Sequence, residues 1–403
     1  MIRGAMKPRV LLVSHSAIVP GYRCLASRMA QRGNLDISLV APRTWIEANS
    51  QQSYIEAPDM DDSIRIMVER TFCWGLRNRT ARNVTHIYPR TLSILDEVKP
   101  HAIYLVEEPY SLVTSSWIWA SSMMGLSPAI IVFSGQSVFK TYPFPFNMLE
   151  RYVLSKTHMF LPVNNDVAGV LRLKGASRTR VVPLGFDENS FRVLTENDKT
   201  SFSENSDCSK GYFNIGFLGT ISRQKGIPEL MQTFEILKKN AHSDENPDFR
   251  LIVVGEGELR DQVKSAEVQN PGKISFRGFI PHSRVPDCLR EFDLLVVPSV
   301  DMDNVREQLG RVIIEAMACG IPVVGSNSGE IGRVIGNPEM VVPQRNPDAL
   351  ATVIRKMACD RDFYEAERVR TIAWARKFSW SAIAATVENH LFDAMDIAGV
   401  RVR

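Results

Sequence analysis

The sequence predicts an α/β fold in which two doubly wound, Rossmann-like domains face each other across a cleft. The chain has 403 residues, of which 44% are hydrophobic, which is enough for two domains with one core each. In both halves, apolar runs of strand length alternate with segments of helical periodicity, a pattern typical of parallel sheets covered by helices. A polar stretch at residues 194–211 separates the halves and indicates a linker. We therefore expect a first domain at residues 1–190, a linker at 191–211, a second domain at 212–380, and a C-terminal helix at 381–403 that returns toward the first domain.

The first half begins with the pattern of a strand, a loop, a helix and a second strand. These elements are expected at residues 10–13, 15–21, 22–31 and 36–40, with Gly33 ending the helix. Further apolar runs predict strands at residues 102–106, 129–133, 159–163 and 180–183. Residues 109–139 carry no charge and are long enough to cross a bilayer. Because Pro128 divides them into a serine-rich helical segment and a strand-like run, we expect no membrane span there.

The second half repeats the alternation. Its apolar runs predict strands at residues 214–218, 249–254, 273–276, 294–298 and 323–325. Between the last two, residues 310–319 have helical spacing, and Gly320 and Pro322 follow as stop signals. The result is a parallel crossover of strand, loop, helix and strand, and ligands of such units bind at the carboxyl ends of the strands.

Two carboxylates stand eight positions apart around the start of this helix. With Glu307 in the loop and Glu315 on the helix, they would lie about 12 Å apart at roughly 1.5 Å of rise per residue. The backbone N–H groups of Leu309, Gly310 and Arg311 open the helix and would attract an anion. One carboxylate could then bind hydroxyls on one side of a diphosphate, and the other carboxylate hydroxyls on the far side. For the spacing alone, an exposed loop glutamate and an unrelated helix-surface glutamate are the alternative, but the surrounding pattern favours a nucleotide-sugar site.

A glycine-bearing loop follows the first strand of the second half. Gly219 lets the backbone approach a ligand, while Arg223 and Lys225 bring positive charge to the end of the strand, where a phosphate would bind. A basic loop that only faces solvent is an equal alternative from these residues alone. Asp301 and Asp303 could chelate a divalent cation, but we expect a polar loop and no metal, because the basic side chains already offer charge neutralisation.

Gly255 and Gly257 also follow a predicted strand, but no third glycine completes a dinucleotide fingerprint. We therefore expect no nicotinamide cofactor, and no other cofactor either.

Several motifs occur in an order that resembles a known family. They are the GxxxxxKG loop at residues 219–226, the GEGELR turn, the REQLGRVIIEAMACGIPVV block, and the SGE segment at residues 328–330. Together they resemble the retaining nucleotide-sugar glycosyltransferases of the GT-B fold, glycosyltransferase family 4. The resemblance covers nearly the whole chain and is most specific between residues 219 and 342.

The resemblance implies roles for the residues of the donor site. Glu315 would bind the ribose hydroxyls, Glu307 the transferred sugar and Lys225 the diphosphate, so that Glu307, Lys225 and Arg223 form the implied catalytic group. The remaining implied donor contacts are Gly219, Phe279, Leu309, Gly310, Arg311, Gly329 and Glu330. The implied donor is a UDP- or GDP-sugar.

In the first domain, the resemblance places Gly21 near the phosphates. Residues 107–109, including Glu108, and Gln136 would lie where the acceptor and the reacting sugar meet. The acceptor would be a glycan or a lipid-linked molecule in polysaccharide or glycoconjugate biosynthesis.

Some residues depart from the family pattern. Thr220 replaces the frequent arginine of the phosphate loop, Leu309 replaces a phenylalanine, Gln136 replaces a histidine and Arg333 replaces a glutamate. Thr220 and Gln136 favour an alternative function, a non-catalytic GT-B subunit that binds a nucleotide-sugar or a partner transferase. A sugar-nucleotide epimerase is a weaker alternative.

The mechanism follows from charge. Breaking the bond between the anomeric carbon and the phosphate leaves negative charge on the diphosphate, which Lys225, Arg223 and the helix N-terminus would stabilise. No dedicated nucleophile stands out, so the family's same-face attack, with retention of configuration, is the working hypothesis.

The first half carries a basic and aromatic segment at residues 70–90, with five arginines, Phe72 and Trp74, and no acidic residue. This composition suits an anionic membrane surface or a lipid-linked acceptor. A helix whose aromatic side chains pack inward is the alternative. No nucleic-acid recognition module is visible. Six scattered cysteines and the lack of a signal peptide predict a cytoplasmic protein, either in solution or at the inner face of the membrane.

Overall fold

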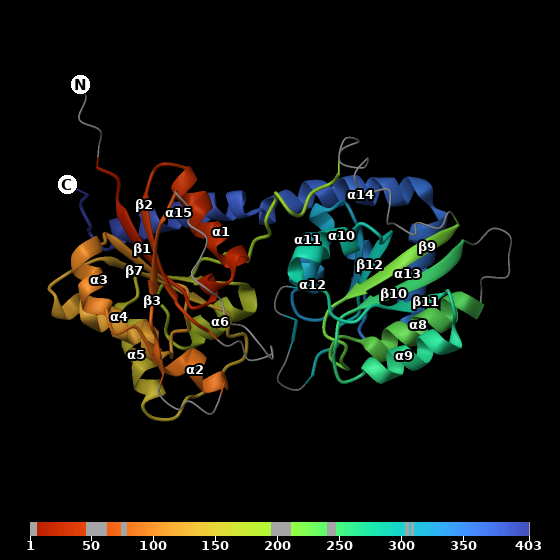
Figure 1. Ribbon diagram of the computed structural model, residues 1–403, viewed down its shortest axis with the longest axis horizontal. Coiled ribbons are helices and arrows are strands. Elements are labelled where there is room, and N and C mark those ends of the chain that lie inside the picture. The colour runs from red at the N-terminus through yellow and green to blue at the C-terminus, as the bar shows by residue number, and fades with distance from the viewer. Residues whose placement is uncertain are drawn as a thin grey trace, which may run out of the picture. The chain divides into compact units, whose positions relative to one another are not determined.

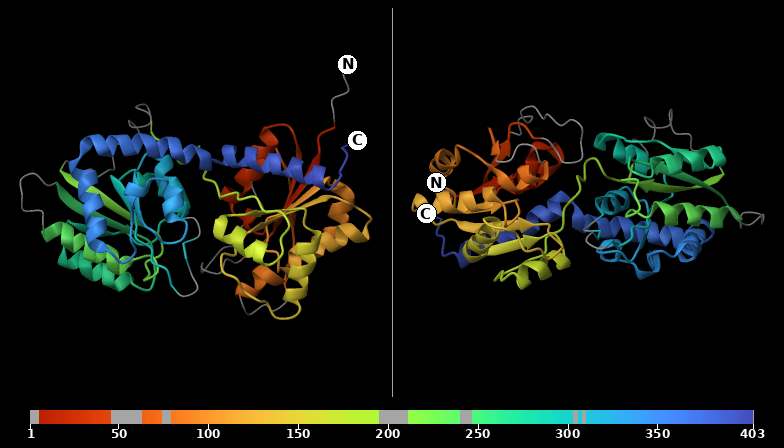
Figure 2. Two further views of the ribbon diagram at one scale, coloured as in Figure 1. Left: turned by 180° about the vertical axis from the view of Figure 1, so that it is seen from behind. Right: turned by 90° about the horizontal axis from the view of Figure 1, so that it is seen from below.

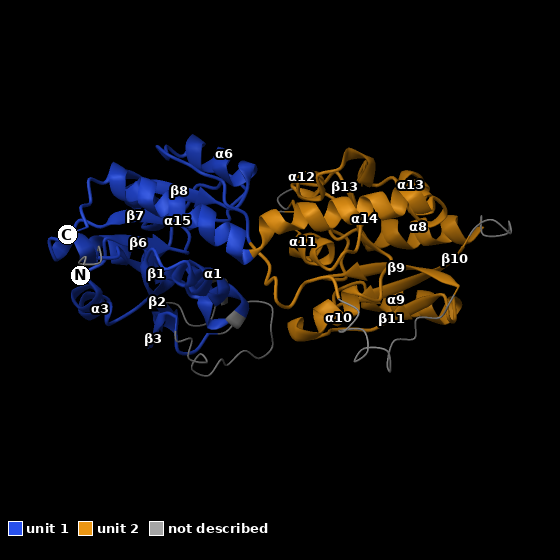
Figure 3. Cartoon of the chain, turned by 90° about the horizontal axis from the view of Figure 1, so that it is seen from above, with its two compact units in different colours: residues 1–184, 380–403 blue, residues 185–379 orange. Residues whose placement is uncertain are grey.

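The chain folds into two compact α/β units. The computed structural model describes residues 6–45, 63–73, 79–194, 211–239, 247–302, 306–307 and 310–402. One unit consists of Met1–Leu184 and Trp380–Arg403, and the other of Gly185–Ser379 (Figure 3). Each unit contains a six-stranded parallel sheet with helices on both faces, which confirms the predicted fold class of two doubly wound α/β domains. Most of the predicted linker, residues 195–210, lies outside the described residues.

The sheet of the first unit has the strand order β3-β2-β1-β6-β7-β8 (Figure 3). Its strands are β1 (Arg9–Val13), β2 (Asp36–Pro42), β3 (Arg65–Glu69), β6 (Ala102–Leu105), β7 (Ala129–Ser134) and β8 (Met159–Pro162). In β1, Leu11 lies between Ser38 of β2 and Ile103 of β6. The strand order reverses between β1 and β6, and doubly wound sheets bind ligands outside the carboxyl ends of strands at such a point.

Helices cover both faces of this sheet (Figures 1 and 2). On one face, α1 (Pro20–Gln31) packs against α15 (Trp380–Ile397), over strand residues such as Leu12 and Tyr104. Leu11 and Ile103 belong to the other core, to which the second group of helices contributes side chains. That group is α3 (Thr91–Val98), α4 (Leu112–Met123), α5 (Phe146–Lys156) and α6 (Asn165–Leu173). The unit also contains η1 (Ser16–Ile18), α2 (Arg79–Thr85), β4 (Phe72–Cys73) and β5 (His86–Ile87).

The charge-free segment forms α4 and β7, as predicted. Ser111 caps α4 by accepting a hydrogen bond from the backbone N–H of Thr114. Among the helices of the described residues, none has both the length and the apolar character needed to cross a bilayer.

The strand predicted at residues 180–183 is wrong. Thr179 makes only an isolated bridge to Phe160 of β8, and two backbone hydrogen bonds, from Arg180 and Val182, continue the pairing. Pro162 of β8 has no N–H group to donate to the Arg180 carbonyl, so the ladder does not extend into a regular strand.

The sheet of the second unit repeats the same topology, with the order β11-β10-β9-β12-β13-β14. The strands are β9 (Tyr212–Leu218), β10 (Asp248–Val254), β11 (Ile274–Phe276), β12 (Leu294–Val297), β13 (Val323–Ser326) and β14 (Val341–Val342). The helices are α8 (Ile227–Lys239), α9 (Arg260–Gln269), α10 (Val285–Leu289), α11 (Arg311–Ala318), α12 (Ile331–Ile335), α13 (Pro347–Cys359) and α14 (Arg361–Ala375). The described part of the unit also includes the short 3₁₀ helices η2 (His282–Arg284), η3 (Pro338–Met340) and η4 (Arg376–Phe378). Because β9 and β12 are neighbours, the loops that follow them emerge at the same sheet edge.

Candidate functional site

The centre of the site in the second unit is an ion pair between Lys225 and Glu307. The Lys225 Nζ atom lies 2.5 Å from Glu307 Oε2. The Lys225 side chain is 28% exposed to solvent and the Glu307 side chain 10%. Ser299, just after β12, lies with its hydroxyl 3.4 Å from the same carboxylate oxygen. The pair therefore places a cation and an anion, both partly accessible, at the carboxyl ends of two adjacent strands.

The position of Lys225 depends on the glycine that follows it. Gly226 has a φ of +74°, and a Cβ atom built on it would lie 2.0 Å from the carbonyl oxygen of Pro298 at the end of β12. The backbone N–H of Val300 also donates to the carbonyl of Gln224 at 2.8 Å. Only glycine lets the loop pack this closely against β12, and this packing brings Lys225 to Glu307.

Glu307 is held from the other side by the turn that contains Gly329 and Glu330. The backbone N–H of Glu330 donates to the carbonyl of Glu307 at 3.1 Å. Gly329 has a φ of +48°, and an added Cβ atom would lie 2.1 Å from the same carbonyl oxygen. The Glu330 side chain itself is buried and accepts a hydrogen bond from Arg333 at 2.7 Å.

The second predicted carboxylate, Glu315, lies on α11 and is 4% exposed. It accepts a hydrogen bond from Arg311 at 3.1 Å, and His282 Nε2 lies 3.2 Å from the same oxygen. Our reading of the sequence did not identify His282, because it lies in η2, 33 residues before Glu315, and no local pattern marks it. Glu315 thus offers a hydrogen-bond acceptor next to two nitrogen-bearing side chains.

The N-terminus of α11 begins at a glycine. Gly310 occupies the N-cap position with a φ of +63° and has no side chain with which to cap the helix. Uncapped N–H groups at a helix start bind anions because the helix dipole favours negative charge. Leu309, predicted to contribute one of these groups, lies outside the described residues.

The remaining predicted donor contacts vary in exposure. Phe279 is 75% exposed, and Arg223 is exposed, with its backbone N–H donating to Glu258 at 3.1 Å. Gly219 packs against Gly255, where an added Cβ atom would lie 1.9 Å from the Gly219 carbonyl oxygen. The structure therefore brings together Lys225, Glu307, Gly310 and Gly329, joins Arg311 to Glu315, and leaves Arg223 and Phe279 at the surface.

The aspartate pair that could have chelated a metal is only partly described. Asp303 lies outside the described residues, and Asp301 accepts a hydrogen bond from the Ser328 hydroxyl at 2.7 Å. Asp301 thus has a structural role that ties the loop after β12 to the turn before α12.

In the first unit, Glu108 follows β6 and binds the end of β7. Its carboxylate accepts hydrogen bonds from the Ser134 hydroxyl and the Gly135 N–H, each at 2.8 Å. Burial raises the pKa of Glu108, although these two hydrogen bonds act in the opposite direction. Gln136 donates its side-chain amide to the carbonyl of Val138 at 3.0 Å. Gly21 is the second residue of α1, and a Cβ atom built there would meet nothing within 4 Å.

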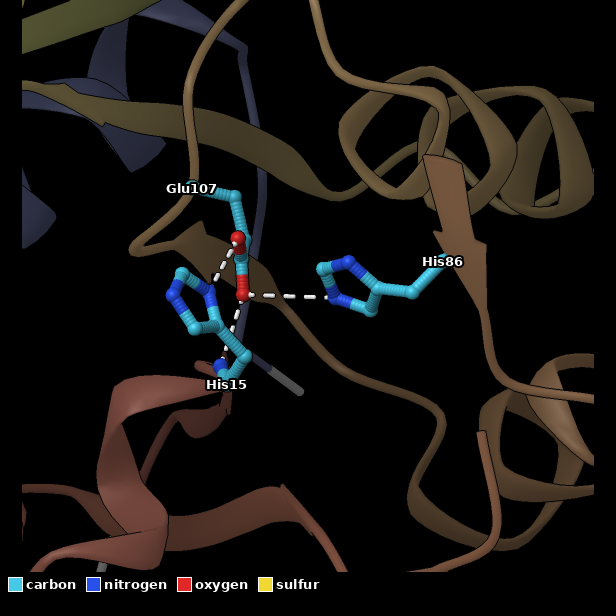
Figure 4. Close-up of side chains that lie close together, drawn as sticks. All are labelled: His15, His86 and Glu107. Atoms are coloured by element: carbon cyan, nitrogen blue, oxygen red, sulfur yellow. Dashed lines mark hydrogen bonds and ion pairs between the residues drawn. The ribbon is translucent and has the colours of Figure 1, made fainter. Parts of the chain in front are cut away.

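A second polar cluster, not predicted from the sequence, joins His15, His86 and Glu107 (Figure 4). His15 donates its backbone N–H to Glu107 Oε1 at 2.7 Å, and its Nδ1 atom lies 2.7 Å from Oε2. The Nε2 atom of the fully buried His86 lies 3.7 Å from Oε1. Trp45 packs beside both imidazole rings, with centroid distances of 4.9 and 4.8 Å. His15 and Glu107 each lie two residues after the end of the neighbouring strands β1 and β6, so strand-end reasoning could have paired them.

Histidine and carboxylate are also ligands of zinc, and the ligand atoms of these three residues lie within 4.8 Å of one another. Two ligands of a tetrahedral zinc ion would lie about 3.3 Å apart, given metal–ligand distances of about 2.0 Å. The 2.7 Å separation between His15 and Glu107 is instead a hydrogen-bond distance. The geometry supports a hydrogen-bonded array.

Burial opposes the ionisation of Glu107, but the nearby imidazoles of His15 and His86 outweigh it and hold the pKa of Glu107 at about 2. A carboxylate whose pKa falls on folding stabilises the protein above its unfolded pKa of 4.5, and the stabilisation is lost as the pH drops toward 2. We expect Glu107→Gln to reduce the free energy of unfolding at pH 7 by about 3 kcal/mol and to flatten its pH dependence between pH 5 and 3. Urea denaturation at pH values from 7 down to 3 measures both effects.

The matched control is Asp96→Asn on α3, whose side chain is 73% exposed. It should leave the slope of stability against pH unchanged. Equal slopes for wild type and Glu107→Gln would contradict the assigned pKa.

The geometry of the second unit can be compared with known proteins. Residues 198–378 match the family model described as Glycosyl transferases group 1. This segment is a glycosyl transferases group 1 domain. The resemblance to glycosyltransferase family 4 is thereby confirmed. Lys225, Glu307 and Glu315 all lie within the glycosyltransferase domain.

Relatives of known activity share part of the chain. The 2-deoxystreptamine N-acetyl-D-glucosaminyltransferase of Streptomyces fradiae is 28% identical over 207 residues, which are 50% of this chain and 47% of that protein. The O-antigen chain mannosyltransferase B of Escherichia coli is 29% identical over 41% of this chain and 42% of its own length. The chain spans about half the length of the curated relatives it matches.

The fold is that of solved GT-B proteins. Anabaena HepE in complex with UDP-glucose aligns with 96% of this chain and 99% of its own, with a TM-score of 0.60 and 17% sequence identity. At this identity the likeness shows the fold of the chain and not its activity or substrates.

Proposed function

We propose that the protein is a retaining glycosyltransferase that transfers a hexose from a nucleotide-diphosphate sugar to a glycan or lipid-linked acceptor. The Lys225–Glu307 pair beside the uncapped N-terminus of α11 is the observation that carries this proposal. A diphosphate would meet Lys225 and the helix N–H groups, while Glu307 would bind hydroxyls of the sugar. Glu315 would bind the ribose. Anabaena HepE, which shares the fold, was solved in complex with UDP-glucose, and this supports a UDP-sugar as the donor.

In the proposed reaction, positively charged groups stabilise the leaving diphosphate. As the bond from the anomeric carbon to the diphosphate oxygen breaks, Lys225, the exposed Arg223 and the α11 N-terminus stabilise the developing negative charge. The acceptor hydroxyl attacks from the same face and passes its proton to the diphosphate, which preserves the anomeric configuration. No step of this proposal requires a metal ion.

Binding of the donor tests the proposal directly. We expect one nucleotide among UDP-, GDP-, ADP- and dTDP-sugars to raise the melting temperature, because a ligand of the folded state adds about 2.7 kcal/mol at a concentration of 100 Kd. Glu315→Ala should abolish the shift. The control is Glu365→Ala on the exposed side of α14, which should retain it. A panel without any shift would contradict the proposed donor site.

The second candidate is a non-catalytic GT-B subunit, which Thr220 and Gln136 favour. Thr220 offers no charge to a phosphate, and Gln136 donates its amide to Val138 within its own loop. Such a subunit would show the thermal shift but release no free sugar from the donor during prolonged incubation without acceptor. A transferase should hydrolyse its donor slowly under these conditions.

We also propose that the protein works in the cytoplasm at the inner face of the membrane. In the basic segment at residues 70–90, Phe72 is 62% exposed, so this aromatic side chain does not pack inward, while Trp74 lies outside the described residues. Phe144 and Trp119, in the same unit, are 76% and 60% exposed. Basic and exposed aromatic side chains on one unit suit an anionic lipid surface.

A further inference from the structure

The first unit contains a cavity of about 230 Å³ beside the His15–Glu107 pair. All its lining residues belong to the first unit. The apolar part of its wall includes Leu12, Leu25, Tyr104, Phe133 and Trp380, from β1, α1, β6, β7 and α15. The cavity therefore lies on the sheet face that α1 and α15 cover.

The polar lining of the cavity gathers at the ends of the strands. Ser14, His15 and Glu107 come after the last residues of β1 and β6, whereas Leu12 and Tyr104 lie within those strands. The His15 side chain is 20% exposed, whereas Ser14 and Glu107, at 5% and 3%, are about as buried as Leu12 and Tyr104. The cavity thus has an apolar interior and a polar mouth, accessible at His15, at the edge of the sheet where ligands of such folds bind.

The volume is large enough for a ligand. Protein interiors contain few voids larger than a water molecule, and an apolar cavity of about 150 Å³ stays dry and binds benzene. At about 230 Å³, this cavity can hold one six-membered ring or a chain of six carbon atoms. An apolar body of that size would bury its surface against the wall residues.

The charged groups at the mouth of the cavity determine which head group a ligand can have. Glu107 is ionised at neutral pH, Glu108 adds a second carboxyl group, and none of the described residues that line the cavity is Lys or Arg. A phosphate or carboxylate head would meet like charge there. A hydroxyl group would instead donate a hydrogen bond to a carboxylate, and such charge-assisted bonds are strong.

We propose that this cavity holds the apolar body of the sugar acceptor, and that the acceptor presents a neutral, hydroxylated head to His15, Glu107 and Glu108. The inference rests on the proposed transferase function and narrows its acceptor class. In the transfer, the acceptor oxygen bonds to the anomeric carbon, the bond from that carbon to the diphosphate oxygen breaks, and the hydroxyl proton passes to the diphosphate. The donor does not fit this cavity, because its diphosphate is anionic.

Three probes of matched structure test the cavity by titration calorimetry with the full-length protein. Hexyl β-D-glucoside has the body and the neutral head, methyl β-D-glucoside lacks the body, and hexyl phosphate carries an anionic head. We expect hexyl glucoside to bind about tenfold or more tightly than either of the others. Glu107→Gln should raise the affinity for hexyl phosphate, because it removes a negative charge from the mouth.

Substitutions that fill the cavity provide the structural control. Leu25→Trp should weaken the binding of hexyl glucoside by about tenfold or more, whereas Gln31→Trp, at an exposed position of the same helix, should leave it unchanged. If Leu25→Trp fails to fold, Val106→Phe at the end of β6 fills the same cavity. Equal binding of hexyl and methyl glucoside, or equal binding by the filled and control variants, would overturn the cavity assignment.

The acceptor role is tested separately by mass spectrometry with the donor identified in the nucleotide panel. A product with one added hexose on hexyl glucoside supports the proposal. Binding of hexyl glucoside without this product, while the donor is hydrolysed, overturns the acceptor role and leaves the transferase function standing. If no nucleotide-sugar binds, the transferase function fails and the acceptor assignment falls with it.

Discussion

Lys225→Met is expected to lower the turnover number about 10²–10³-fold, the loss typical when one preorganised donor to a developing negative charge is removed. The Lys225 Nζ atom lies 2.5 Å from Glu307 and is the partly exposed cation at the ends of β9 and β12. Without the Lys225 side chain, this positive charge no longer stabilises the departing diphosphate. Glu307, whose side chain is 10% exposed, also loses its ion-pair partner. Turnover of the donor identified in the nucleotide panel, measured at saturating concentration, gives the loss.

The control for charge alone is Lys264→Met on α9 of the same unit, where the residue is exposed. It should leave turnover within about twofold of wild type, because surface charges contribute little to such a site. If the two variants were equally active, Lys225 would not be the group that stabilises the diphosphate.

Gly226→Ala is expected to reduce both stability and turnover. The added Cβ atom would lie 2.0 Å from the Pro298 carbonyl oxygen, and the left-handed conformation at φ +74° is itself unfavourable for alanine. The loop can relieve the clash only by moving away from β12, which separates Lys225 from Glu307. We expect a loss of about 1–2 kcal/mol from the backbone conformation and roughly 1–3 kcal/mol more from the clash, measured by urea denaturation.

Gly272→Ala is the control that introduces the backbone strain without the clash. Gly272 has a nearly identical φ of +75°, but a Cβ atom there would meet nothing within 4 Å. This variant should lose only the stability that the backbone conformation costs, about 1–2 kcal/mol, and should keep full turnover. Similar stability and activity for both variants would show that close packing at Gly226 does not position Lys225.

Sequence patterns predicted the elements that place the proposed donor site because that site depends on strand ends. Lys225 and Glu307 are 82 residues apart, but each follows one of two adjacent parallel strands, so the fold class alone brings their loops to one edge. His282 and His86 carry no such signal. His282 reaches Glu315 from a 3₁₀ helix, and His86 reaches Glu107 from a short antiparallel pair, so their contacts depend on loop conformation.

The predicted strand at residues 180–183 failed because of its pairing partner. Its apolar residues follow the hydrophobic pattern of a strand, yet Pro162 of β8 has no N–H group to donate to the Arg180 carbonyl, so a longer ladder lacks that bond. Conversely, β3 and β14 form although their sequences were not recognised as strands, since they pair at the edges of sheets that longer strands already define. Pairing partners far along the chain decide such edge elements, and a local pattern does not contain them.

The division of the chain also bears on how the protein is synthesised. The second unit is inserted between Leu184 and Trp380, and its two ends meet where the backbone N–H of Phe186 donates to the Phe378 carbonyl at 3.0 Å. The core under α1 needs Trp380, Ile383 and Leu391 of α15, which leave the ribosome only after the whole second unit. The unit translated first is therefore the last to be completed, and until then the nascent chain exposes the apolar face of its first sheet, a state that chaperones or the nearby ribosome surface would have to protect.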